Sequence, residues 1–395
     1  MKEFEKLCLS SKATVIFREI LKDDAVCALL KLLAADDNDA KAFIELYSDF
    51  VSALYKKCDN LTEYLNRILQ NDENIYVKEA AKGEVSPLLK CAAENELDFF
   101  EQLGKVTSEE IKAHINLDIF LPEWKNGGIS IKSEYEKKMA AIKTTGYGIY
   151  ADHRMFLYKD GKIIPVKYPD PQRLSQMSGY ESERQKVIDN TLALINGKPC
   201  NNALLYGDAG SGKSSTVKAI VNEYYSMGLR LIEIKKNQLY SLPDVIEQLA
   251  DNPLKFIVFI DDLSFSSNDA DFGALKAILE GGVAGKTDNI AIYATSNRRN
   301  LVKENFSDRN GDDIHIQDTV QEIMSLSARF GLKVTFSRPD KDLYLSIVEN
   351  LALQYNINEK TDELFISAEA FALRNGGRSP RTAKQFIEYL ASKED

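Results

Sequence analysis

The chain has 395 residues, of which 44% are hydrophobic, and carries a formal net charge of −10 at pH 7. Its length and apolar content suffice for two or three packed domains and exclude an intrinsically disordered chain. The negative charge argues against nonspecific nucleic-acid binding, because that affinity comes mainly from Lys and Arg neutralising phosphates, although a local basic patch is compatible with it.

Neither a membrane span nor a secretory signal is recognisable. No apolar run reaches the roughly 18 residues of a spanning helix, and the first residues, MKEFEKLCLSSK, contain no apolar stretch. Five scattered cysteines without a CxxC pair, and three distant histidines, suggest neither a disulfide framework nor a zinc site. We therefore expect a soluble, cytoplasmic protein with no membrane partner.

Residues 1–140 have the pattern of an all-helical domain. They contain only two prolines, Pro87 and Pro122, and their apolar residues recur at helical spacing. The clearest apolar face consists of Phe43, Ile44, Tyr47, Phe50, Val51 and Leu54. Such a stripe is more often core than a docking groove, and no residue of this region suggests chemistry.

Residues 141–171 are expected to form a β-hairpin and a linker. The segment RMFLYKDGKIIPV predicts two short strands joined by a turn at Asp160 and Gly161. The following segment, Tyr168 to Pro171, has two prolines, which disfavour a helix and remove backbone donors. It is the best linker candidate in the chain.

Residues 172–338 alternate between short apolar strands and helical stretches. The predicted strands are ALLYG, RLIEI, FIVFID, NIAIYATSN and LKVTF. Apolar strands separated by helices predict an α/β domain with a buried parallel sheet. Residues 339–395 return to a helical pattern.

A complete G-x-x-x-x-G-K-[ST] motif follows the first strand of this α/β region and opens a helix. Such a loop surrounds phosphates with backbone amides, so the motif predicts bound ATP and Mg²⁺. We expect Lys213 to reach the β and γ phosphates and the Ser214 hydroxyl to ligate magnesium. The predicted nucleotide-binding residues are Gly207, Asp208, Ala209, Gly210, Ser211, Gly212, Lys213, Ser214 and Ser215.

Two carboxylates end a buried strand some fifty residues later. Asp261 and Asp262 follow five apolar residues, which places them at the carboxyl edge of the sheet, where ligands bind. Asp261 is expected to hold Mg²⁺ directly or through water, and Asp262 to orient or deprotonate the attacking water. A strand ending in two aspartates is a weak motif alone and becomes strong after a P-loop.

These motifs, in this order, resemble the AAA+ superfamily. More narrowly, they resemble the bacterial family of predicted AAA+ ATPases known as DUF815, over residues 145–395. The resemblance implies a P-loop core, a helical C-terminal lid over residues 339–395, and an oligomer that hydrolyses ATP at subunit interfaces. The N-terminal domain would then select an unidentified macromolecular client.

The resemblance also implies roles for two residues beyond the motifs. Asn297 ends the strand NIAIYATSN, where AAA+ proteins carry a polar sensor of the γ phosphate; the alternative is an Asn that caps the strand. Arg329 lies in SLSARFGL, where AAA+ proteins carry an arginine finger that acts on a neighbouring subunit's nucleotide. The alternative for Arg329 is an interface or surface salt bridge.

A second sensor is implied in the segment GGRSPRTAKQF. Arg381, just past Pro380, would start a helix of the lid and project over the γ phosphate, and Arg378 is the competing candidate. In the segment LSQMSGYESERQKVID, Tyr180 lies where AAA+ proteins pack on adenine. It could equally be a core aromatic, because adenine pockets are themselves apolar.

The chain departs from the AAA+ pattern at two points. Most active members have Glu where this chain has Asp262, whose side chain is one methylene shorter, so slow turnover is expected. There is no aromatic-hydrophobic-Gly pore loop, since the candidate region 264–271 is polar. Residues 303–318 are rich in Asp and Asn and predict a mobile loop rather than a metal site, because the spacing of their carboxylates does not match a calcium loop.

Three functions are compatible with these residues. The first is an oligomeric ATPase that remodels or loads a macromolecular partner, which Arg329 and Arg381 favour. The second is a nucleotide-gated scaffold or switch with slow or negligible hydrolysis, which Asp262 and the polar pore region favour. The third, a small-molecule kinase, is disfavoured because no acceptor pocket is evident.

Overall fold

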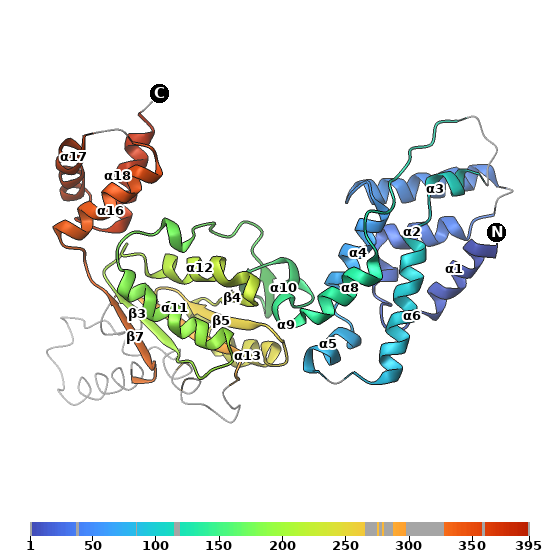
Figure 1. Cartoon of the computed structure of the whole chain (residues 1–395), viewed down its shortest axis with the longest axis horizontal. Coiled ribbons are helices and arrows are strands. Elements are labelled where there is room, and N and C mark those ends of the chain that lie inside the picture. The colour runs from blue at the N-terminus through green and yellow to red at the C-terminus, as the bar shows by residue number, and fades with distance from the viewer. Residues whose placement is uncertain are drawn as a thin grey trace. The chain divides into compact units, whose positions relative to one another are not determined.

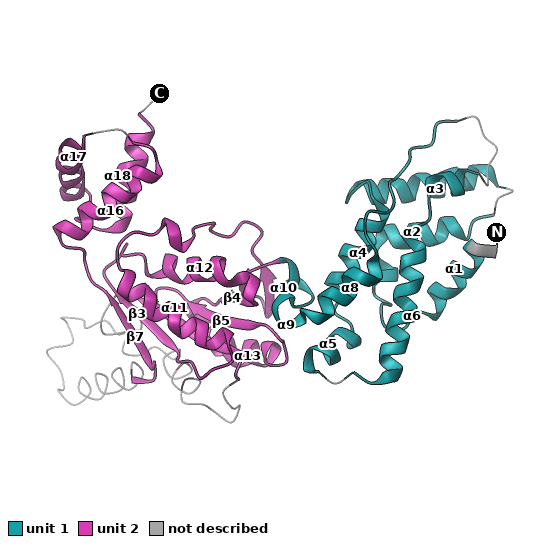
Figure 2. Ribbon diagram, viewed as in Figure 1, with its two compact units in different colours: residues 1–152 teal, residues 153–395 magenta. Residues whose placement is uncertain are grey.

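A computed structural model of the chain describes residues 2–36, 39–83, 85–113, 119–264, 275, 279, 287–297, 328–357 and 360–393. It divides into two compact units, Met1–Asp152 and His153–Asp395 (Figure 2). No helix in the described parts of the chain is both long and apolar enough to cross a membrane.

The first unit is built from helices, as predicted (Figure 1). The predicted apolar face of α3 lies in its core, with Tyr47, Phe50 and Leu54 fully buried. Trp124 packs against two of these rings, with centroid distances of 5.6 Å to Tyr47 and 4.9 Å to Phe50. The helices are α1 (Lys2–Ala13), α2 (Asp24–Leu33), α3 (Ala40–Tyr55), α4 (Leu61–Asn71), α5 (Ile75–Lys82), α6 (Pro87–Leu103), α7 (Ser108–Lys112), α8 (Ile131–Ala140), α9 (Ile142–Thr145) and α10 (Ile149–Asp152).

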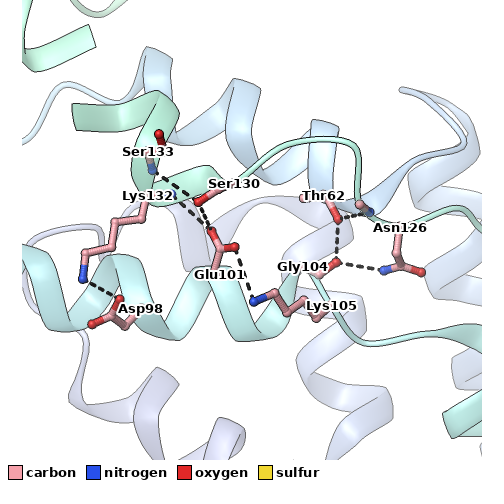
Figure 3. Close-up of polar contacts among 10 residues, drawn as sticks. Thr62, Asp98, Glu101, Gly104, Lys105, Asn126, Ser130, Lys132 and Ser133 are labelled. Carbon is pink, nitrogen blue, oxygen red and sulfur yellow. Dashed lines mark hydrogen bonds and ion pairs between the residues drawn. The ribbon is translucent and has the colours of Figure 1, made fainter. Parts of the chain in front are cut away.

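Polar side chains fix the segment that precedes α8 onto α4 and α6 (Figure 3). The Thr62 hydroxyl donates to the Gly104 carbonyl at 2.7 Å and accepts from the Gly127 amide at 2.8 Å. Asn126 donates to the same Gly104 carbonyl at 2.8 Å. These bonds satisfy the carbonyl of Gly104, the residue that caps the carboxyl end of α6, and they tie the non-helical segment to that helix end.

The second unit contains one seven-stranded sheet and its covering helices. The strand order is β2-β1-β4-β5-β6-β3-β7, and every neighbouring pair except β1 and β2 is parallel. Helix α11 packs beside α12 and against β7, while α12 packs against β4 (Figure 1). The elements are β1 (Met155–Lys159), β2 (Lys162–Pro165), α11 (Glu181–Ile195), β3 (Ala203–Gly207), α12 (Lys213–Tyr224), β4 (Leu229–Glu233), α13 (Leu242–Ala250), β5 (Lys255–Ile260), β6 (Ile290–Ser296), β7 (Leu332–Phe336), α16 (Lys341–Gln354), α17 (Thr361–Arg374) and α18 (Pro380–Ala391).

The predicted hairpin is present and belongs to the sheet. Asp160 and Gly161 both have positive φ, 51° and 76°, as a two-residue hairpin turn with the twist of its strands requires. Strand β1 pairs in parallel with β4, with Met155 opposite Leu231. The segment predicted as hairpin and linker, residues 141–171, therefore divides between the units: α9 and α10 lie in the first, and the hairpin extends the sheet of the second.

The strand order brings the predicted motifs to one edge of the sheet. Strand β6 lies between β5 and β3, so Asn297 at its end stands between the two aspartates and the P-loop. Helices α16, α17 and α18 pack on one another and share a hydrophobic core with the sheet, including Tyr180, Phe336 and Ile347. The helical C-terminal region is thus in direct contact with the α/β core.

Candidate nucleotide-binding site

The loop between β3 and α12 has a backbone that only glycine adopts readily. Gly207 has φ 138°, and a Cβ there would lie 2.0 Å from the Phe336 carbonyl oxygen of β7. Gly210 and Gly212 have φ 78° and 91°. A larger residue at Gly207 would separate β3 from β7, so this glycine allows the loop to leave the sheet beside its neighbouring strand.

Lys213 is the first residue of α12, and its ammonium group lies inside the loop. Its Nζ donates to the carbonyls of Gly207 at 2.9 Å and Asp208 at 2.7 Å, and to Asn297 Oδ1 at 3.1 Å. The residue is only 5% exposed. Burial lowers the pKa of this ammonium group, and the carboxylates of Asp208, Asp262 and Asp261 oppose that effect.

Ser214 and Asp261 meet at the amino end of α12. The Ser214 hydroxyl donates to Asp261 Oδ1 at 2.6 Å. The same carboxylate oxygen accepts from the Thr295 hydroxyl of β6 at 2.5 Å and from the Asp262 amide at 3.1 Å. Three donors, from α12, from β6 and from the turn after β5, therefore fix the rotamer of Asp261, and the predicted metal residues are brought together.

Asn297 connects the lysine to the second aspartate. Its Nδ2 donates to Asp262 Oδ1 at 2.7 Å, while its Oδ1 accepts from Lys213. A strand-capping Asn would bond backbone groups of its own strand end, whereas these bonds join side chains of β5 and α12. The amide is thus oriented between the phosphate loop and the carboxylate at the end of β5.

A cavity of about 480 Å³ opens over these groups. Polar groups of its lining come from the P-loop, Asp261, Asp262, Thr295 and Asn297. The segment before α11 and helices α16 and α18 of the C-terminal region also line it, with Met177, Tyr180, Ile347, Leu351, Pro380, Arg381 and Lys384 among the lining residues. A lining that combines phosphate-binding polar groups with apolar side chains suits a nucleoside polyphosphate.

Tyr180 lines this cavity and also belongs to the hydrophobic core. Its ring packs on Phe336 at 5.4 Å between centroids, and its hydroxyl donates to the Ser337 carbonyl. Burial raises its pKa to about 12. The two interpretations of this tyrosine are compatible, because one buried ring contributes both to the cavity wall and to the hydrophobic core.

Arg184 of α11 lines the cavity next to Tyr180, a role that was not predicted from the sequence. Arg184 is 7% exposed, and its guanidinium donates to the carbonyls of Met177 and Gly179, as well as to Glu181. Its bonds hold a turn that lines the cavity, with Met177 and Tyr180 among the lining residues. The helical pattern of the segment gave no signal for this role, because an Arg on a helix is usually solvated.

The two candidate arginines of the C-terminal region lie in different environments. Arg378 forms a bidentate pair with Glu369, at 2.8 and 2.6 Å. Arg381 lines the cavity, and its backbone amide donates to the Gly210 carbonyl of the P-loop at 3.2 Å. The start of α18 therefore contacts the phosphate loop directly, with Arg381 at the contact.

Arg329 is exposed in the turn before β7 and does not line the cavity of its own chain. The polar segment 264–271, apart from Ser264, and the segment 303–318 lie outside the described residues. So do Ser325, Leu326 and Ser327, which precede Arg329 in the finger motif.

Comparison with known proteins gives a family for this arrangement. Residues 151–394, more than half of the chain, match the family described as "Protein of unknown function (DUF815)". The chain belongs to the DUF815 family. This confirms the family predicted from the motifs, and the match spans the second unit, including the hairpin and the C-terminal helices.

Two curated relatives are similar over a shorter stretch. The replication factor C large subunit of Staphylothermus marinus is 32% identical over 123 residues, 29% of this chain and 28% of that protein. The protein of the same name from Thermofilum pendens is 29% identical over 119 residues, 28% of each chain. This DUF815 chain thus spans under a third of the length of these relatives.

The solved structures found to be similar include the Thermotoga maritima RuvB Holliday junction branch migration motor. It is 15% identical, with a TM-score of 0.39 over 56% of this chain and 65% of that chain. A point mutant of the same protein gives 16% identity and a TM-score of 0.40 over 56% and 66%. Scores this low carry no argument about this DUF815 protein.

The donor set of the DUF815 site suits Mg²⁺. Ser214 and Asp261 supply hydroxyl and carboxylate oxygens, the hard ligands that this ion takes. Within the described ranges, no group of three or more His, Cys, Asp or Glu side chains is placed to hold a metal. Mg²⁺ keeps waters, takes phosphate oxygens and needs only one or two protein carboxylates.

Proposed function

We propose that this DUF815 protein binds ATP with Mg²⁺ and hydrolyses it in an oligomer, so as to remodel or load a macromolecular partner. The observation that carries the proposal is the continuous set of hydrogen bonds from Ser214 through Asp261 to Asp262, Asn297 and Lys213. Phosphoryl transfer depends chiefly on positioned charges, and these side chains provide them in the lining of one cavity.

Each residue then has a defined part in the reaction. Lys213 binds the β and γ phosphate oxygens, and Ser214 with Asp261 would hold Mg²⁺, which when bound neutralises charge on the phosphates. Asp262 accepts a proton from, or orients, the attacking water, and Asn297 holds that water or a γ oxygen beside it. Arg381 contributes positive charge from the lid side of the cavity.

The proposed oligomer rests on Arg329. Its exposed position outside the cavity of its own chain favours action on a nucleotide bound to a neighbouring copy. A guanidinium supplied in trans accelerates other NTPases by about 10³- to 10⁵-fold, so each subunit alone would turn over slowly. The N-terminal unit lies outside the family match apart from its last two residues, and we propose that it selects the client.

One observation favours the alternative of a nucleotide-gated switch. The lid contacts the P-loop through the bond from the Arg381 amide to the Gly210 carbonyl, so any movement of the loop on nucleotide binding would reach α18. In that case ATP would set the lid conformation and hydrolysis would only time its release.

Mixing two inactive variants tests the proposal. Lys213→Ala weakens nucleotide binding but keeps Arg329, whereas Arg329→Ala keeps the P-loop and removes the finger. We expect each variant alone to have negligible turnover and the mixture to regain part of it, because a Lys213→Ala subunit supplies Arg329 to its neighbour's intact site. Wild-type specific activity should also rise cooperatively with protein concentration.

Three results would separate the functions. Wild-type turnover in Arg329→Ala would remove the finger assignment. ATP binding without turnover at any concentration would favour the switch. Absence of ATP binding by the wild-type protein would contradict the proposed function altogether.

A further inference from the structure

Thr295 is a buried polar residue beside both aspartates that no motif identifies. It lies one residue after Ala294, which pairs with Ile260 at the end of β5, so it stands next to Asp261 across the sheet. Its side chain is 2% exposed. A hydroxyl at this depth must form hydrogen bonds to repay its desolvation.

The Thr295 hydroxyl makes one bond to each aspartate. It donates its single proton to Asp261 Oδ1 at 2.5 Å and accepts from the Asp262 backbone amide at 2.9 Å. The bond to the Asp261 carboxylate is charge-assisted, which makes it stronger than a bond between neutral groups. A backbone bond from the Leu263 amide to the Thr295 carbonyl, at 2.7 Å, also holds the turn after β5 against β6.

These bonds accompany an unusual backbone at Asp262. Its φ is 53°, a left-handed conformation that costs free energy for a residue with a side chain. The conformation turns the amide of Asp262 back toward Thr295 and Asp261, while its carboxylate accepts from Asn297. The Thr295 hydroxyl is one of two acceptors that this amide has in that conformation.

We propose that Thr295 is a positioning residue that sets the orientation of the metal-site carboxylate and of the water-orienting carboxylate together. It fixes the Asp261 rotamer that meets Ser214, and it stabilises the turn that directs Asp262 to Asn297. The inference rests on the proposed function, because it assumes that Asp261 holds Mg²⁺ and that Asp262 orients the attacking water.

Thr295→Val tests this with little change in shape, since valine is also β-branched and suits a strand. Thr295→Ser restores the hydroxyl, and Thr191→Val is the matched control. Thr191 is likewise fully buried and bonds the Val187 carbonyl and the Tyr293 hydroxyl, but it does not line the cavity.

Two readouts are needed, and one is independent of turnover. The first is the affinity for ATP and for a non-hydrolysable ATP analogue, measured in excess EDTA and across a Mg²⁺ titration. The second is turnover at saturating ATP. We expect Thr295→Val to bind nucleotide in EDTA within about twofold of wild type, but to need about tenfold more Mg²⁺ for half of the metal-dependent gain in affinity, equivalent to ~1.4 kcal/mol.

Turnover of Thr295→Val should fall at least about tenfold, because both carboxylates lose their orientation. Thr295→Ser should lie close to wild type in both readouts, and Thr191→Val should leave the Mg²⁺ dependence unchanged. An unchanged Mg²⁺ dependence in Thr295→Val would overturn the proposal. So would an equal loss of affinity in EDTA and in Mg²⁺, which would indicate a general structural role.

The same experiment separates this inference from the proposed function. If the wild-type protein binds Mg²⁺ and ATP without hydrolysis, the hydrolytic function fails while the shift in Mg²⁺ dependence still supports Thr295. If wild type hydrolyses ATP and Thr295→Val matches it in both readouts, the proposed function stands and the role of Thr295 is refuted.

Discussion

Replacing Asn297 by Ala should separate nucleotide binding from hydrolysis. The substitution removes the 2.7 Å bond to Asp262 and the 3.1 Å bond from Lys213. Lys213 keeps its bonds to the Gly207 and Asp208 carbonyls, so the phosphate loop retains its structure and ATP affinity should change by less than about threefold. The lost contact with the carboxylate matters most in the transition state.

The size of the effect follows from the kind of bond. Removing one preorganised donor from a reacting centre costs about 10²- to 10³-fold in kcat in other enzymes. The bond to the Asp262 carboxylate is charge-assisted but exposed to solvent at Asn297, so we expect the lower end, a fall of about 10²-fold. Turnover at saturating ATP and the dissociation constant of ATP measure the two quantities separately.

A matched variant removes the same side chain elsewhere. Asn196→Ala deletes an exposed Asn at the end of α11. In the described structure its side chain donates to the Leu192 carbonyl of the same helix. It should leave turnover unchanged. Wild-type turnover in Asn297→Ala would refute the sensor assignment and return Asn297 to a strand-end role.

Four further substitutions test other parts of the structure. Lys213→Ala should weaken ATP binding at least tenfold, roughly the loss of one charge-assisted contact to phosphate, and titration calorimetry would contradict the P-loop assignment if affinity were normal. Arg381→Ala should lower nucleotide affinity or turnover because Arg381 lines the cavity, whereas Arg378→Ala should only lower the melting temperature because Arg378 pairs with Glu369; the reverse pattern would exchange the two roles. Lys138 is 7% exposed, and burial lowers the pKa of its ammonium group from 10.5 to about 8. Because the folded protein holds this charge at a cost at pH 7, Lys138→Met should stabilise the first unit by about 1–3 kcal/mol. The unfolded chain then binds more protons between those two values, so wild-type stability should rise with pH across that window, and chemical denaturation should show no such rise in Lys138→Met.

The part of the site that could be predicted is the part encoded by contiguous residues. The P-loop could be predicted because its glycines, lysine and serine must occur at fixed spacing in one loop. The strand before Asp261 could be predicted from its run of apolar residues. The fold followed from the same local signals. The two hairpin strands were predicted from their alternation, but the pairing of β1 with β4 was not, since parallel pairing depends on strand order rather than on the segment itself.

The missing parts depend on register and on side-chain partners. Thr295 and Asp261 are 34 residues apart, and only the pairing of β5 with β6 brings them together. Similarly, the sequence left two arginines in competition for the lid sensor, because both lie near the start of one helix. The difference between them is Glu369, nine residues before Arg378, whose carboxylate engages one guanidinium and not the other.

The departure at Asp262 bears on both functions. A shorter carboxylate would reach less far from a straight strand end, but the left-handed backbone at Asp262 bends the chain there and brings its carboxylate to Asn297. The contact between Asp262 and Asn297 within one subunit therefore does not distinguish fast hydrolysis from slow hydrolysis. The two proposed functions then differ in whether Arg329 of a neighbouring copy reaches the nucleotide, and turnover as a function of protein concentration measures that step directly.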